Sequence, residues 1–502
     1  MDLPDLQNSA MPPAQEADDA SKPNRTLPSS RYGPELLSTA LLLALPAFML
    51  LAVLLRPFGF ADLGWQLRLG EIIYRQGSPF VAEPFAATHL GEALTPNAWL
   101  GQLIFAQVRE WSGLLGLRAL DALLWIGGIL AAALPARHRR ERPLAILLAL
   151  LVGFTVALPS ASIRPQSFAL LGFGLTLVLA QTVNSPRKAL LIGGPMFVLW
   201  QNLHPSVPIA ALAIAAVAAL RWARHLARNE ARPWALTALT VAAGISVFAT
   251  PAGWHIVEFA RYNEYASRLM EASEWFPLWA PVNREFMWLV IVGTILATGV
   301  AYRNRDRIKA EEVVPALVCL AATILAVRFI PFFGIALVPI LARAKIGHHF
   351  APRRRSALTG SALTGIVMIA ELLIVPVRFE PQLPVAAVTK LKETNVSGTI
   401  FCDPAFGGLV ADTGYPDWTV SFDGRFYRYT PDEWRLFQRT SAGPISLASL
   451  DDLYKPVAYV LAPTRSEALI RKLRGAPARW RQLHADAKSV VFVRSASTDR
   501  RR

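Results

Sequence analysis

Long apolar runs, separated by short polar links, occupy most of the chain. Each run is close to the length that a helix needs to cross the hydrocarbon layer of a membrane. The pattern therefore predicts an α-helical polytopic membrane protein with about eleven transmembrane helices. The runs lie near residues 36–55, 115–135, 144–159, 167–183, 189–204, 207–220, 233–250, 286–301, 313–328, 329–342 and 357–376.

The stretch 57–99, which follows the first run, has a different pattern. Polar residues are interspersed there with apolar residues. The apolar residues Leu63, Leu67, Ile72 and Ile73 recur at helical spacing. This periodicity predicts an amphipathic helix that lies along the membrane face. Such a helix would hold Asp62 at the mouth of a cavity between the spans.

After Val377 short strand patterns alternate with helix-like stretches. The alternation predicts a small C-terminal α/β domain over residues 378–502. Residues 1–34 are rich in Pro, Ser, Asn and Asp and predict a disordered tail, which leaves 35–377 as the transmembrane domain. The expected strands are Thr399–Asp403, Thr419–Asp423, Val457–Ala462 and Ser489–Arg494, and the expected helices include Pro431–Arg439 and Ser466–Arg474.

Composition and charge fit a membrane protein better than a nucleic-acid-binding one. The chain is 53% hydrophobic and 17% charged, with a mean hydropathy of +0.35 and a net charge of +15. The basic residues gather in short links between apolar runs, as the positive-inside rule expects of cytoplasmic loops. We therefore expect no nucleic-acid partner. The basic links are 137–142, 187–188, 221–232, 303–309 and 343–355.

If the spans alternate in direction, the basic links face the cytoplasm and the remaining links face outward. The N-terminus is then cytoplasmic, and the C-terminal α/β domain is extracytoplasmic. The first apolar run begins near Leu36 and is long enough to span, so it predicts a signal anchor. The two cysteines, Cys319 and Cys402, lack the spacing of metal ligands, and neither a disulfide framework nor a zinc site is expected.

Asp62 is the strongest candidate for chemistry in the first external loop. A carboxylate at the membrane face could act as a general base, or hold a divalent cation that neutralises a phosphate. The alternative is an interfacial carboxylate that pairs with Arg68, a helical step or two away.

Three external links carry candidates for anion binding. Arg164 suits a phosphate, although a charge that snorkels to the headgroups explains it equally well. Asn202 and His204 end an apolar run, where a helix-helix hydrogen bond is the simpler interpretation. Arg328 lies before Pro331, which predicts a helix break that lines either a phosphate pocket or a re-entrant corner. In the longer external loop, Glu274 stands out beside Trp275.

Two aspartates end predicted strands of the C-terminal domain. Asp403 precedes a proline and Asp423 precedes a glycine. Ligands bind at the strand ends of α/β sheets, but Asp-Pro and Asp-Gly are also common turns, and we favour the turn interpretation.

The order of several short motifs resembles the GT-C superfamily of glycosyltransferases, which includes protein mannosyltransferases and aminoarabinose transferases. The resemblance covers about residues 57–494. Related proteins commonly show an acid-x-acid pair and then Trp-Trp-His, whereas this chain has a single acid, Asp62, and Trp65-Gln66. The motifs are Asp62–Gly70, Asn97–Leu100, Arg164–Gln166, Asn202–His204, Arg328–Pro331 and Phe422–Arg425.

The resemblance implies a sugar donor linked to polyprenyl phosphate. Carried over by position, Asp62 becomes the catalytic acid or base, and Arg164, His204 and Arg328 become ligands of the donor phosphate. Glu274 is added as a second catalytic candidate. Substrate contacts are expected from Trp65, Gln66, Arg68, Asn97, Trp99 and Asn202. No residue is assigned as a metal ligand, and the need for a divalent cation is left open.

The leading hypothesis is a glycosyltransferase of the bacterial inner membrane, with its C-terminal domain in the periplasm. It moves a sugar from the lipid-linked donor to an extracytoplasmic acceptor: an envelope glycan, a lipid or a protein. The alternative is a catalytically inactive membrane component that scaffolds envelope polysaccharide assembly, which the missing acid and His favour. The expected partners are a polyprenyl-phosphate sugar, membrane lipid and envelope glycan assembly proteins.

Overall fold

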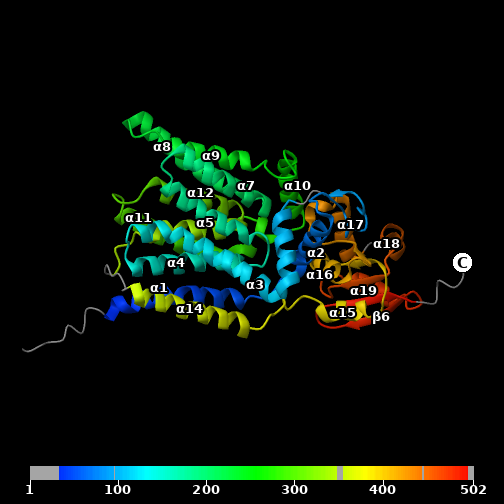
Figure 1. The fold of residues 1–502 in the computed structure, drawn as a ribbon. Helices are drawn as coiled ribbons and strands as arrows, with labels where there is room; N and C mark the ends of the chain where they lie inside the picture. The colour runs from blue at the N-terminus through cyan, green and yellow to red at the C-terminus, as the bar shows by residue number, and fades with distance from the viewer. Residues whose placement is uncertain (1–32, 95–96, 348–353, 444–445, 496–502) are drawn as a thin grey trace, which may run out of the picture.

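The computed structural model describes residues 33–94, 97–347, 354–443 and 446–495. Apolar helices lie side by side at one end of the molecule, and an α/β unit occupies the other end (Figure 1). Helices α2 (Phe60–Gln76) and α10 (His255–Leu269) lie between the two parts. Most of the predicted disordered tail, residues 1–32, lies outside the described residues.

Every apolar run of the sequence falls on helical structure. Among the described residues, five helical segments are long and apolar enough to cross a membrane: Trp99–His138, Pro143–Ser160, Val207–Arg228, Pro281–Arg303 and Ala357–Ile374. Other apolar helices are shorter, so the total of about eleven spans stays a prediction. The bundle comprises α1 (Gly33–Leu54), α3 (Trp99–His138), α4 (Pro143–Ala157), α5 (Ser167–Thr182), α7 (Gly194–Leu203), α8 (Val207–Arg228), α9 (Trp234–Ser246), α11 (Arg284–Arg303), α12 (Ala310–Leu325), α13 (Ile330–Leu341) and α14 (Arg354–Ile374).

Basic links that the charge pattern assigns to one side of the membrane meet at one end of the bundle. Arg343 donates to Glu141 at 2.8 Å and to Glu312 at 2.9 Å, and Arg307 donates to Glu141 at 2.9 Å. Arg139 also donates to Glu312. Both carboxylates are buried, so these pairs fix the links firmly to each other. That this end faces the cytoplasm stays a prediction.

The C-terminal part is a mixed sheet covered by helices. Its strand order is β4-β3-β5-β7-β6; β3 is parallel to β4 and β5, and β7 is antiparallel to β5 and β6. Four strands lie where the sequence pattern expects them. The strand β6 was not expected, because its side chains are largely exposed and lack an apolar alternation. The strands are β3 (Gly398–Cys402), β4 (Trp418–Val420), β5 (Ala458–Leu461), β6 (Trp480–Ala485) and β7 (Val490–Arg494).

Five helices accompany the sheet, and α17 and α19 correspond to the two helices that the sequence predicts. Their bounds are α15 (Val385–Lys392), α16 (Pro404–Gly414), α17 (Pro431–Ala442), α18 (Leu447–Tyr454) and α19 (Glu467–Arg474). Asp403 caps α16 by accepting a hydrogen bond from the backbone N–H of Ala405 at 3.0 Å. This contact agrees with the turn interpretation of that aspartate.

Helix α2 is the predicted amphipathic helix, but protein covers it on two sides. It packs against the first half of α3 and against α16 of the C-terminal part. A Cβ added to Gly64 would lie 2.1 Å from the carbonyl oxygen of Gly408, so only glycine allows these two helices to approach so closely. Arg68 pairs with Glu71 at 2.7 Å and with Asp412 at 3.0 Å, so it does not form the pair with Asp62 that was the alternative interpretation of that carboxylate.

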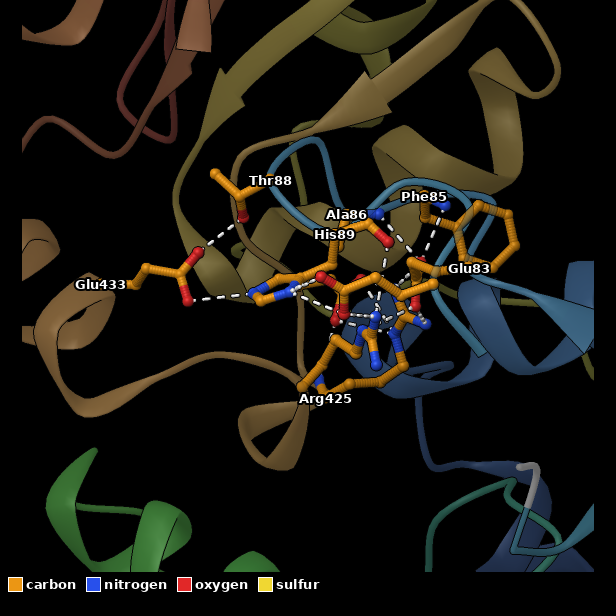
Figure 2. A network of polar contacts seen from close by, with 10 residues as sticks. Glu83, Phe85, Ala86, Thr88, His89, Arg425 and Glu433 are labelled. Carbon is orange, nitrogen blue, oxygen red and sulfur yellow. Dashed lines mark hydrogen bonds and ion pairs between the residues drawn. The ribbon is translucent and has the colours of Figure 1, made fainter. Parts of the chain in front are cut away.

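A buried ion cluster joins the loop 57–99 to the C-terminal part, and we call it the clamp (Glu83, Asp423 and Arg425). The Arg425 guanidinium donates to Glu83 at 2.7 and 2.9 Å and to Asp423 at 2.6 Å (Figure 2). All three side chains are 0% exposed. Nearby, His89 contacts Glu433 at 3.0 Å across the same boundary. The clamp fixes the C-terminal part above the loop that carries Asp62.

Candidate active site

A cavity of about 140 Å³ opens where the helix bundle, the loop 57–99 and the C-terminal part meet. Seven separate segments of the chain contribute residues to it. Its lining comprises Asp62, Trp65, Gln66, Asn97, Ala98, Arg164, Gln166, His204, Pro205, Asn263, Ser267, Glu274, Trp275, Arg328, Gly424, Phe426 and Tyr427.

Acids and arginines alternate across the cavity, and we call this set the ionic chain (Asp62, Arg164, Glu274 and Arg328). Arg164 lies 2.7 Å from Asp62 and 3.6 Å from Glu274, and Arg328 lies 3.6 Å from Glu274. These side chains are 19–40% exposed. The pair at 2.7 Å is a full charge-assisted hydrogen bond, whereas the two contacts of Glu274 are looser.

The local structure places each member of the ionic chain. Asp62 lies in the first turn of α2, where the helix dipole favours a negative charge. Arg164 lies in the link before α5 and is oriented by Ser162, whose Oγ accepts from its Nε at 2.8 Å. Arg328 lies in a 3-10 turn between α12 and α13, at the predicted helix break, and its guanidinium stacks 3.8 Å from the centre of the Trp275 ring.

The two cavity acids differ in their protonation behaviour. Burial raises the pKa of Asp62 above its ordinary value of 3.8, and Arg164 only partly offsets this effect. Burial would also raise the pKa of Glu274, but Arg328 and Arg164 together hold that pKa below its ordinary value. Asp62 is therefore the better proton acceptor, and Glu274 is the more firmly ionised group.

His204 is a neutral member of the cavity. The guanidinium groups of Arg328 and Arg164 line the same cavity and disfavour a further positive charge on the imidazole. Its Nδ1 lies 2.9 Å from the Oγ of Ser206, which already accepts a hydrogen bond from the Trp200 indole at 3.0 Å. The Ser206 hydroxyl can then donate to Nδ1, which places the imidazole proton on Nε2.

The C-terminal part reaches Asp62 directly. A Cβ added to Gly424 would lie 2.3 Å from the Oδ1 of Asp62 and 3.2 Å from the carbonyl oxygen of Ala61. Any larger residue at position 424 would therefore push the Asp62 carboxylate out of its place beside Arg164.

The cavity contains most of the residues that the sequence singled out, but not all of them. Arg68 lies on the α16 side of α2. The Trp99 indole donates to Asn202 at 2.7 Å, and Asn202 in turn donates to the carbonyl oxygen of Ala249 at 2.6 Å, away from the cavity lining. These three side chains join parts of the fold to each other and are not among the residues that line the cavity.

Several lining residues were not expected as site residues: Gln166, Asn263, Ser267, Phe426 and Tyr427. Gln166 belongs to the Arg164–Gln166 motif, which was a usable signal. Asn263 and Ser267 lie on α10, and Tyr427 lies far along the chain from the loop that it faces. Sequence spacing offers no signal for such long-range contacts.

The lining residues do not form a donor set suited to a divalent cation. In the part of the chain that the structure describes, no three His, Cys, Asp or Glu side chains gather in a group that could hold a metal ion. Asp62 and Glu274 each face a guanidinium, so a cation between them would lie beside Arg164. Positive charge for an anionic ligand comes here from the arginines.

No protein-family model and no curated protein matches the chain. The solved structures similar to it include two of ArnT from Cupriavidus metallidurans. The structure in the apo state has a TM-score of 0.54 at 13% identity and covers 91% of this chain and 98% of that one. The structure bound to undecaprenyl phosphate has a TM-score of 0.51 at 14% identity and covers 93% and 99%. The chain therefore shares the fold of ArnT over most of its length.

Proposed function

We propose that this protein is an inner-membrane glycosyltransferase that moves a sugar from a polyprenyl-phosphate donor to an extracytoplasmic acceptor. The observation that carries the proposal is the ionic chain within one cavity. It combines a carboxylate of raised pKa with two arginines able to hold a phosphate. The similar fold of ArnT, solved with undecaprenyl phosphate, supports the choice of a lipid-linked donor.

Asp62 acts on the acceptor side of the cavity. It takes the proton from an acceptor hydroxyl as that oxygen attacks the anomeric carbon of the sugar. The bond between this carbon and the phosphate oxygen breaks, and the electron pair leaves with the polyprenyl phosphate. Arg164 keeps Asp62 ionised and aimed at the cavity before the proton arrives.

Arg328 and His204 act on the donor side. The guanidinium of Arg328 holds the phosphate and stabilises the negative charge that grows on it as the bond breaks. His204 donates from Nε2 as a neutral group. Glu274 serves as the resident counter-ion of both arginines, and its 3.6 Å contacts are loose enough for a phosphate to replace them. This role revises the catalytic one expected for Glu274.

The positions of the two ends of the bundle support the proposed orientation. The cavity is lined by residues of α2, α10 and the C-terminal part, which lie at the opposite end of the bundle from the ion-paired links after α3, α11 and α13 (Figure 1). If those basic links face the cytoplasm, the cavity opens to the periplasm.

Complementation of a deletion strain tests the proposal. Wild type, Asp62→Asn and the exposed control Asp432→Asn are compared at equal membrane abundance, and envelope glycans are measured by mass spectrometry. Loss of a general base slows such a reaction by about 10²–10⁴-fold. We expect one sugar to disappear with Asp62→Asn alone. Full rescue by Asp62→Asn would instead favour the scaffold alternative.

A further inference from the structure

One wall of the cavity carries uncharged polar side chains instead of ionic ones. We call it the neutral wall (Asn263, Ser267 and Tyr427). Asn263 and Ser267 are four residues apart on α10 and share one of its faces. Ser267 is only 2% exposed. Among the described residues, none of these three side chains has a hydrogen-bond partner, although each carries polar atoms and lines the cavity.

The neutral wall is held rigidly by contacts outside the cavity. The ring of Tyr427 meets Phe259 of α10 edge to face, with ring centres 4.5 Å apart. The Tyr262 hydroxyl donates to the carbonyl oxygen of Tyr429 at 2.7 Å. The clamp residue Arg425 lies two positions before Tyr427. Polar groups that are fixed in place and left without protein partners are suited to bind a ligand.

The chemistry of these groups indicates what they bind. Amide and hydroxyl groups both donate and accept hydrogen bonds, as sugar hydroxyls require. Burial raises the pKa of Tyr427, so its hydroxyl keeps the proton at neutral pH. A cationic sugar would need a carboxylate, yet both cavity carboxylates, Asp62 and Glu274, already face arginines that would repel it.

We propose that the neutral wall binds the hydroxyl groups of the donor sugar, and that this sugar is uncharged. The inference rests on the proposed function, because it places the sugar between Asp62 and the phosphate held by Arg328. It also makes the C-terminal part a component of the sugar site through Tyr427.

Binding of lipid probes to the full-length protein in nanodiscs tests this inference without an acceptor. The probes are undecaprenyl phosphate, the same lipid carrying glucose, galactose or mannose, and the same lipid carrying 4-amino-4-deoxyarabinose. At least one neutral sugar should bind more tightly than undecaprenyl phosphate and than the amino sugar. Tyr427→Phe and Ser267→Ala should each weaken that probe by about three- to tenfold and leave undecaprenyl phosphate unchanged.

Two controls separate the possible failures. Tyr265→Phe removes an exposed hydroxyl from the same helix and should change nothing. Arg328→Gln should weaken every phosphate-bearing probe, since it tests the proposed function alone. A deoxy sugar that lacks the hydroxyl bound by Tyr427 should bind wild type and Tyr427→Phe with equal affinity. If the tyrosine were merely structural, Tyr427→Phe would weaken the binding of the deoxy sugar as well.

The outcomes that overturn the inference are distinct from those that overturn the proposed function. Tightest binding of the amino sugar, no gain from any neutral sugar, or equal weakening of undecaprenyl phosphate by the wall variants would overturn the neutral wall alone. Binding of undecaprenyl phosphate no tighter than that of phosphate-free polyprenol would overturn both.

Discussion

The clamp and the ionic chain use the same kinds of side chain in opposite ways. In the clamp, Arg425 donates to two carboxylates, and all three groups are completely buried. In the ionic chain, Glu274 reaches two arginines only at 3.6 Å, and the groups remain partly exposed to a cavity. A saturated buried cluster cannot exchange partners without a large cost, whereas a loose accessible one can. The structural cluster and the candidate site contain the same kinds of charged group. They differ in whether each charge has close protein partners and in whether the groups are exposed to a cavity.

The largest expected effect comes from breaking the clamp. Arg425→Met leaves Asp423 buried without its cation and leaves Glu83 with Arg428 alone, whose Nε lies 3.2 Å away, which should destabilise the protein by about 3–5 kcal/mol. Thermal unfolding in detergent measures this change. Arg435→Met, at an exposed pair on α17, should leave the unfolding temperature unchanged, and adding Glu83→Gln to Arg425→Met should recover part of the loss. Equal unfolding temperatures for both arginine variants would show that the clamp is not structural.

The next effect sharpens the comparison, because it disturbs the ionic chain and spares the clamp. Gly424→Ala pushes the Asp62 carboxylate away from Arg164, and misplacement of a catalytic group by about 1 Å costs about 100-fold in rate. We expect a fall of that order in kcat with little change in unfolding temperature. Gly365→Ala is the matched control, since an added Cβ there meets open space. Unchanged kcat in Gly424→Ala would argue against Asp62 as the base.

The smallest effect is a shift of the pH profile. Asp62 loses its base form as the pH falls through its pKa, and burial places this pKa above 3.8. As the pH is lowered, the fall in kcat/KM should therefore be centred at a pH above 3.8. Arg164 lowers this pKa and Glu274 raises it. Arg164→Gln should therefore move the acid limb to higher pH, and Glu274→Gln should move it to lower pH. Shifts in the same direction would contradict the ionic chain.

The sequence predicts the helical regions of the bundle well, because apolar runs are local signals. It also singles out Asp62, Arg164, His204, Glu274 and Arg328, which the structure brings into one cavity. It fails where packing decides the outcome. The resemblance put Trp99 and Asn202 among the expected substrate contacts, whereas their side chains hydrogen-bond to each other, which is the simpler interpretation given for Asn202. Tyr427 and Ser267 gave no signal, since only the packing of the C-terminal part and of α10 brings them to the cavity.

The clamp joins residues that are 342 positions apart, and this separation has a consequence for how the protein is made. The ribosome delivers Glu83 early, while Arg425, Gly424 and Tyr427 arrive only with the last part of the chain. Until that part has been made and has docked, Glu83 lacks its cations and the cavity lacks a wall. Incomplete chains therefore lack a complete candidate site.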